Sequence, residues 1–233
     1  MNLVLLVEGA QTEPRAYRAW LQRHLPVLKP AQNVSDLADD GYVLVKGNGY
    51  PSCYRRLEGL FRDMNDCPGK VNAFWLCLDS DEDTYEARLE EAKAAVSEAA
   101  KEVRLAKSNP SLDVRVIVQH CCIETWFLGH ESFLRAGPQQ RDLVEFKRFH
   151  NVSVDDPELM GTPPGYVTRQ SFHFAYLKAM FKERHEVYSK AQPGAALHPS
   201  YFDTLRTRWK RTGHIKSFGV LLDAFSAAGA QGL

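Results

Sequence analysis

The stretch NLVLLVEG, residues 2–9, decides the fold of this chain. Residues 2–7 form a short apolar run that contains β-branched side chains, and the run ends at Glu8 and Gly9. An apolar run of this length that ends in a turn residue is typical of a strand buried on both faces of a parallel sheet. The sequence therefore predicts that the chain opens with such a strand.

Short apolar strands and amphipathic helices alternate along the residues that follow. A helix is expected from Thr12, which we predict as its N-cap, with apolar residues at helical spacing up to Leu25. Further strands are expected at 42–46, 71–78 and 113–119, with helices after each of them, near 54–64, from 84 to 103 and from 123. This order predicts an α/β fold, a parallel sheet with helices on both faces joined by right-handed crossovers.

The pattern changes near residue 130. No convincing strand follows, residues 155–165 are rich in proline and glycine, and helical patterns occupy 172–184, 201–211 and 218–225. We therefore predict two domains, an α/β catalytic domain at 1–130 and a C-terminal helical subdomain, or cap, at 131–233.

Composition excludes several classes of protein. The chain has 233 residues, with 29 basic and 29 acidic side chains, which fits a globular protein and not a disordered or fibrous one. No apolar stretch is long enough for a membrane span or a signal-peptide core, so we expect a cytoplasmic protein with no membrane partner. The five cysteines form no Cys-x-x-Cys pair, which favours reduced core thiols over disulfides or a structural zinc site.

Positive charge is concentrated late in the chain. Residues 165–217 hold 10 basic and 3 acidic side chains, whereas residues 1–164 hold 19 and 25. A basic segment of this kind can contact phosphates, although a solvated helix face has the same composition. The candidate nucleic-acid-binding residues are Arg169, Lys210, Arg211 and Lys216.

Four carboxylates follow the predicted strands. Glu8 follows the first, Asp79 and Asp81 the third, and Glu124 the fourth. The carboxyl ends of parallel strands share one edge of a sheet, where crowded carboxylates repel one another unless a cation neutralises them. Oxygen ligands favour Mg²⁺ or Mn²⁺. The alternatives are simpler: Asp-x-Asp can cap the next helix, and Glu8 can interact with a helix dipole.

Three motifs resemble a known family. Leu6-Val7-Glu8-Gly9 followed by Thr12-Glu13, then Leu78-Asp79-Ser80-Asp81, is similar to the signature of Toprim catalytic domains. The segment CIETWFL at 122–128 resembles one in small stand-alone bacterial Toprim proteins of the RloB type, which are related to OLD nucleases. The spacing between Gly9 and Thr12 is one residue longer than in that pattern.

The resemblance implies a set of roles. Glu8 would be a metal ligand or general acid/base, Asp79 and Asp81 would hold Mg²⁺, and Glu124 would complete the metal site. Lys216, in a late helix, matches more weakly and would join Glu8, Asp79 and Asp81 as a catalytic residue. The family also implies a partner ATPase in a phage-defence or restriction system.

These observations lead to a first hypothesis and two alternatives. The first is a Mg²⁺-dependent nuclease that cleaves phosphodiester bonds of DNA or RNA, as a monomer or homo-oligomer, with His173 and His214 as candidate proton donors. The second is a non-catalytic metal-binding subunit that docks on a partner ATPase. The third is a receiver domain or haloacid-type phosphatase, which the chain length and the missing Asp-x-Asp after the first strand disfavour.

Overall fold

The computed structural model describes residues 1–231, and its chain divides into two units. The sheet unit comprises Met1–Leu78, Glu86–Val118 and the C-terminal residues from Asp223. The helical unit comprises Asp79–Tyr85 and Gln119–Leu222.

Five parallel strands form the sheet of the first unit. Their order across the sheet is β2-β3-β1-β4-β5. β1 lies in the middle and pairs with β3 on one side, where Val4 is opposite Val43, and with β4 on the other, where Val4 is opposite Phe74. The bounds of the strands are β1 Asn2–Val7, β2 Lys29–Ala31, β3 Gly41–Lys46, β4 Ala73–Asp79 and β5 Asp113–Gln119.

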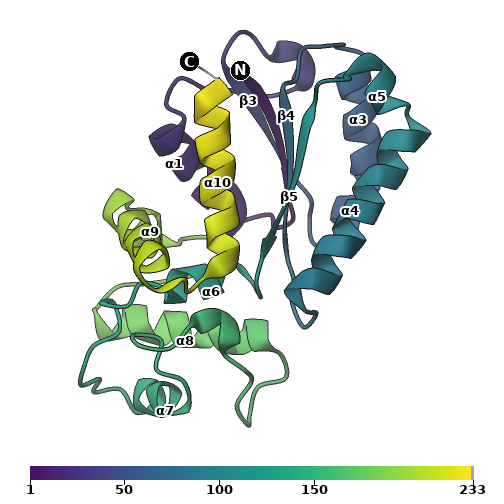
Figure 1. Ribbon diagram of the computed structural model, residues 1–233. Helices are drawn as coiled ribbons and strands as arrows, with labels where there is room; N and C mark the ends of the chain where they lie inside the picture. The colour runs from purple at the N-terminus through teal and green to yellow at the C-terminus, as the bar shows by residue number, and fades with distance from the viewer. Residues whose placement is uncertain (232–233) are drawn as a thin grey trace. The chain divides into compact units, whose positions relative to one another are not determined.

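Helices cover both faces of this sheet, which confirms the predicted fold class (Figure 1). α1 and the C-terminal part of α10 lie on one face, and α3, α4 and α5 lie on the other. Successive side chains of β4 point to opposite faces. The ring centroid of Trp75 lies 5.6 Å from that of Phe225 in α10, and the ring centroid of Phe74 lies 5.0 Å from that of Phe61 in α3. Strand β1 is buried along its whole length, as a strand covered on two sides must be.

The helices begin and end close to the predicted positions, with a few differences. The bounds are α1 Thr12–His24, α2 Ser52–Arg55, α3 Leu57–Asn65, α4 Tyr85–Glu102, α5 Leu105–Ser108, α6 Ile123–Leu128, α7 Arg141–Phe149, α8 Arg169–Glu183, α9 Pro199–Thr212 and α10 Lys216–Gln231. The N-cap of α1 is Gln11, so the prediction of Thr12 was wrong by one position. The helix expected at 54–64 is divided at Arg56 into α2 and α3.

The helical unit contains α6 to α9 and the first turns of α10. Thr168 begins α8 through a capping box, in which its hydroxyl accepts from the Ser171 amide and the Ser171 hydroxyl lies 3.3 Å from the Thr168 amide. Phe146 of α7 packs edge-on against Phe172 of α8 at 5.2 Å, which joins these two helices. The prediction of a mainly helical region after residue 130 agrees with these elements, while its boundary as a domain stays a prediction.

The strand order reverses between β1 and β4. The chain leaves β1 for strands on one side of it and leaves β4 for β5 on the other side. In open parallel sheets, ligands bind outside the carboxyl ends of the two strands at such a point. Glu8 follows β1 directly, and Asp79 is the last residue of β4.

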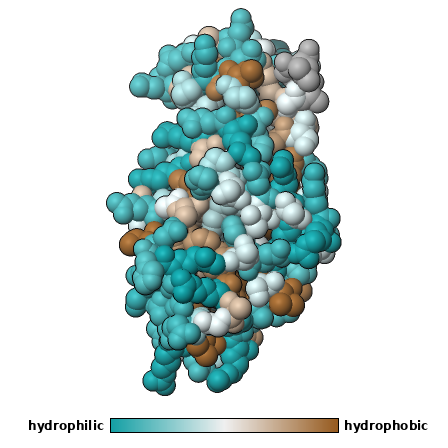
Figure 2. All heavy atoms as spheres, turned by 90° about the vertical axis from the view of Figure 1, so that its left-hand side faces the viewer, coloured by the Kyte–Doolittle hydropathy of each residue, from teal (hydrophilic) through white to brown (hydrophobic). Residues whose placement is uncertain are grey.

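The outer surface of the described chain is largely polar on the face drawn in Figure 2, where apolar side chains form scattered spots. Within residues 1–231, no helix combines the length and the apolar character that crossing a bilayer would require.

A buried arginine organises the helical unit and gives the first prediction. Arg208 of α9 donates to the carbonyl oxygens of Gly129, Val152 and Asp155. Replacing it with alanine leaves these buried acceptors without their donor, so Arg208→Ala should lower the free energy of unfolding by roughly 2–4 kcal/mol. Urea denaturation measures this change. Arg206→Ala, which removes an exposed ion pair with Asp203, should cost no more than about 1 kcal/mol; equal losses in the two variants would contradict the assignment.

Candidate functional site

The acidic loop after β4, residues 80–83, is held by backbone hydrogen bonds in the helical unit. The Ser80 amide donates to the Gln119 carbonyl at 3.1 Å, and the Asp81 amide donates to the Cys121 carbonyl at 2.9 Å. Asp81 has a φ of 50°, in the left-handed region that aspartate tolerates better than most residues. The loop therefore follows the segment after β5 closely before it turns towards α4.

Asp79 and Glu124 are two buried carboxylates of the helical unit. Asp79 is 5% exposed and Glu124 is 1% exposed. The Tyr188 hydroxyl donates to Glu124 Oε1 at 2.9 Å, and Gln170 Nε2 lies 3.4 Å from Asp79 Oδ2. Burial raises the pKa of the Cys122 thiol well above its usual value, and the charges of Glu124 and Asp79 act on it in the same direction. The two predicted ligands thus lie within electrostatic range of one side chain.

Glu124 owes its position to the start of α6. Cys122 is the N-cap of this helix, so Glu124 lies in its first turn. The amide groups at a helix N-terminus favour a negative charge, which reduces the cost of burying this carboxylate. The sequence CIETWFL therefore forms a turn that places a glutamate at the carboxyl end of β5.

Glu8 belongs to the sheet unit, where it leaves β1 under several constraints. Its amide donates to the Cys77 carbonyl at 2.8 Å, and its Oε1 accepts from the Tyr50 amide at 3.2 Å. A Cβ atom on Gly9 would lie 2.1 Å from the Glu13 carboxylate, so glycine is required for Glu13 to fold back over it. Glu8 is 8% exposed and is held at the end of the strand by these contacts.

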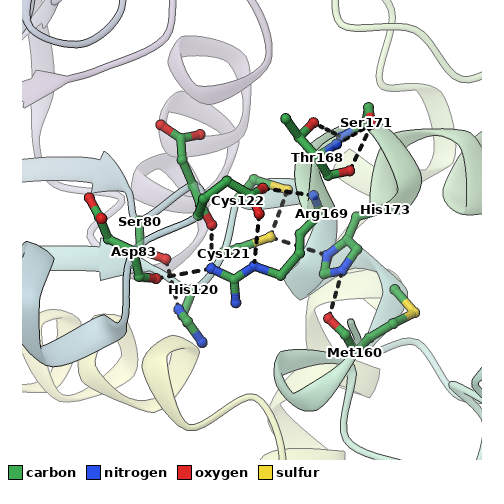
Figure 3. A network of polar contacts seen from close by, with 12 residues as sticks. Ser80, Asp83, His120, Cys121, Cys122, Met160, Thr168, Arg169, Ser171 and His173 are labelled. Atoms are coloured by element: carbon green, nitrogen blue, oxygen red, sulfur yellow. Dashed lines mark hydrogen bonds and ion pairs between the residues drawn. The ribbon is translucent and has the colours of Figure 1, made fainter. Parts of the chain in front are cut away.

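Arg169 binds the acidic loop through main-chain atoms. Its Nη2 donates to the carbonyls of Asp81 at 2.5 Å and Asp83 at 2.9 Å, and its amide donates to Glu82 Oε1 at 2.7 Å (Figure 3). Its Nε lies 3.7 Å from Glu82 Oε2. The guanidinium predicted to contact phosphate therefore also holds the loop that carries Asp81.

The other predicted basic residues lie at the ends of helices in the helical unit. Lys210 and Arg211 occupy the last turn of α9, and Lys216 is the first residue of α10. Arg211 is paired with the Glu131 carboxylate, while Lys210 and Lys216 are exposed. Lys216 is followed by Ser217, whose amide donates to Glu158 Oε1 at 3.0 Å and thereby fixes the start of α10.

The two histidines named from the sequence make structural contacts. His214 Nδ1 lies 3.1 Å from Nη2 of the buried Arg208, a donor, so this nitrogen accepts. His173 is buried and lies near Thr125, Cys121 and the Met160 carbonyl. These contacts account for both residues as parts of the helical unit.

Two cysteines near His173 were not predicted from the sequence as site residues. Cys121 and Cys122 follow β5, and their sulfur atoms are 4.0 Å apart. Hydrogen bonding from the neighbouring thiol and from His173 lowers the pKa of Cys121. The adjacent cysteines were visible in the sequence, but His173 lies 52 positions away and only the fold joins them.

Comparison of this chain with family models, with curated proteins and with solved structures gives no match in any of the three.

The hold of Arg169 on the loop gives a second prediction. In Arg169→Ala, two carbonyls lose a charged donor, so the loop should open more often. Hydrogen–deuterium exchange of the amides at 81–83 should accelerate by roughly tenfold or more, because a hydrogen bond to a charged group contributes about 1.5–3 kcal/mol. Arg148→Ala, which changes an exposed arginine on α7, should leave this exchange unchanged. Unchanged exchange in Arg169→Ala would refute the role.

Proposed function

We propose that the protein is a divalent-metal-dependent phosphodiesterase that cleaves nucleic acid. The observation that carries this proposal is the burial of two carboxylates, Asp79 and Glu124, in the helical unit. The charges of both act on the same side chain, Cys122. Buried carboxylates are costly unless a positive charge or strong donors compensate them. A dication meets that need directly, and phosphodiester hydrolysis is a common use of such a site.

The donor atoms of these residues fit Mg²⁺ or Mn²⁺. Carboxylate oxygens are the ligands that both ions prefer, and Glu124 Oε1 accepts a hydrogen bond from the Tyr188 hydroxyl. Glu8, at the end of β1 in the sheet unit, stays a predicted ligand on the sequence motif alone. A bound ion of this class would activate water and stabilise negative charge on the substrate.

The remaining residues have positioning and binding roles in this proposal. Asp79 and Glu124 hold the ion, Asp81 supplies a half-exposed carboxylate on the adjoining loop, and Arg169 fixes that loop. Lys216 and Lys210 have the role of contacting phosphates in this proposal. Both side chains are exposed and therefore accessible to a nucleic acid. A role in phage defence together with a partner ATPase belongs to the same proposal and rests on the family resemblance alone.

One observation favours the alternative of a non-catalytic subunit that docks on a partner. The helical unit exposes three large apolar side chains in a single segment, Val154, Leu159 and Val167, the last of them 95% exposed. Large exposed apolar side chains are often found at contact surfaces. Metal binding without cleavage would support this alternative.

Charge-neutral variants of the proposed ligands test the enzymatic function. Asp79→Asn, Glu124→Gln and Glu8→Gln should each lower Mg²⁺- or Mn²⁺-dependent cleavage of plasmid, single-stranded DNA or RNA by roughly a hundredfold or more, because a lost ligand removes several kcal/mol of charge stabilisation. Gel assays at equal protein concentration measure the rates.

The matched control for these variants is Glu98→Gln, which alters an exposed glutamate on α4 and should cleave at the wild-type rate. Cleavage that survives in Asp79→Asn and Glu124→Gln would rule out the proposed ligand set. Circular dichroism of each variant separates loss of activity from loss of fold.

The proposed phosphate contacts predict a change in salt dependence. Lys216→Ala and Lys210→Ala should each weaken binding of single-stranded DNA in EDTA and reduce the slope of log K against log salt by about one. Fluorescence anisotropy across a salt series measures both quantities. Lys101→Ala, at the exposed end of α4 in the sheet unit, should leave the slope unchanged; an equal effect in all three variants would argue against a specific basic surface.

A further inference from the structure

Two thiols and an imidazole meet inside the helical unit, apart from the chemistry proposed above. Cys121 and Cys122 lie between β5 and α6, and His173 lies in the first half of α8. All three side chains are buried, and one ligating atom from each lies within 4.8 Å of the others (Figure 3). Sulfur and imidazole nitrogen are ligands that favour zinc-class ions and not Mg²⁺.

The imidazole is oriented as it is in metal centres. His173 Nε2 lies 3.3 Å from the Met160 carbonyl oxygen, a contact in which the nitrogen must carry the proton because a carbonyl only accepts. Nδ1 is then the nitrogen with a lone pair, and it faces Cys121 Sγ at 3.3 Å. A backbone carbonyl that fixes the far nitrogen of a ligating histidine is a common outer-shell arrangement.

The spacing of the donor atoms fits a tetrahedral ion. Sγ of Cys121 is 4.0 Å from Sγ of Cys122 and 3.3 Å from Nδ1 of His173. Bond lengths of about 2.3 Å to sulfur and 2.0 Å to nitrogen place tetrahedral ligands about 3.8 Å apart for two sulfurs and about 3.5 Å apart for sulfur and nitrogen. The observed separations differ from these by a few tenths of an ångström.

Thr125 Oγ1 stands at the fourth corner of this arrangement. It is 3.5 Å from each sulfur and 2.7 Å from His173 Nδ1. The four atoms therefore outline a small tetrahedron, with an oxygen where a structural or catalytic zinc site holds its fourth ligand or a water molecule.

We propose that Cys121, Cys122 and His173 bind a single zinc-class transition-metal ion, with the Thr125 hydroxyl or a water molecule in the fourth position. On binding, the two thiols lose their protons to solvent and two sulfur–metal bonds form. The ion would join the segment between β5 and α6 to α8. This proposal does not depend on the proposed cleavage activity, because Mg²⁺ does not select thiolate ligands.

A network of protein hydrogen bonds is the competing explanation for the same contacts. The Thr125 hydroxyl can donate to His173 Nδ1, and the Cys122 amide lies 3.3 Å from Thr125 Oγ1 as a donor. In that case the cluster is packed core without an ion. The two explanations differ in whether the purified protein binds a thiolate-seeking metal.

Cobalt(II) is the probe that tests this proposal, because thiolate ligation gives a near-ultraviolet charge-transfer band and tetrahedral ligation gives intense visible bands. Metal-stripped, reduced wild-type protein titrated with Co²⁺ should develop both bands, saturate at one ion per chain and lose them when Zn²⁺ is added. Cys121→Ser, Cys122→Ser and His173→Gln should each abolish or strongly reduce the bands.

Cys77→Ser is the matched control, since it changes a buried cysteine of β4 in the sheet unit and should retain the full spectrum. Asp79→Asn should retain the thiolate band as well, which keeps a failure of this proposal distinguishable from a failure of the proposed carboxylate site. Absence of the thiolate band in folded wild-type protein, or its persistence in both cysteine variants, would overturn the proposal.

Discussion

The burial of negative charge after β4 and β5 is the constraint on which the functional account depends. Asp79 and Glu124 are almost fully removed from solvent. An isolated carboxylate in such a place would take up a proton or destabilise the fold, so its charge must be balanced by donors, dipoles or a cation. The first turn of α6 and the Tyr188 hydroxyl provide part of this balance for Glu124. In the proposed function, a dication would supply further positive charge to both carboxylates.

The loop that carries Asp81 is held in place by hydrogen bonds from two segments of the helical unit. Its backbone pairs with the segment after β5 through Ser80 and Asp81, and Arg169 donates to its carbonyls from the start of α8. The arginine contacts the main-chain oxygens of Asp81 and Asp83 and also pairs with the Glu82 carboxylate. A basic residue near an acidic loop can thus hold the loop in place, and composition alone does not distinguish this role from a phosphate contact.

Local patterns predicted most of the fold because most elements follow from local physics. The apolar run at β1 and the heptad-like spacing of α4 each determine a structure by their own periodicity. β2 was missed because its three residues, Lys29–Ala31, are too few to show an alternating pattern and include a proline. They obtain their strand conformation from pairing with β3. The helix at 54–64 was predicted in one piece because its apolar spacing continues across Arg56. The structure has two helices there, α2 up to Arg55 and α3 from Leu57.

The candidate site was predictable only where it depends on strand ends. Glu8, Asp79 and Glu124 follow strands, so their positions could be expected from topology. The cluster of Cys121, Cys122 and His173 could not, because it needs the packing of α8 against the β5–α6 segment. The absence of a Cys-x-x-Cys spacing argued against a zinc site in the sequence, yet two adjacent cysteines and a distant histidine supply the same ligand types.

Thermal unfolding in the presence and absence of Mg²⁺ tests the central claim most directly, because it measures charge compensation and not activity. The account predicts that Mg²⁺ raises the Tm of the wild-type protein. At a Mg²⁺ concentration a hundred times Kd, the free energy of unfolding should rise by about 2.7 kcal/mol. It also predicts that the double variant Asp79→Asn/Glu124→Gln is at least as stable as wild type without the ion and gains nothing from it. A wild-type Tm that does not respond to Mg²⁺, or an equal rise in the double variant, would contradict the account.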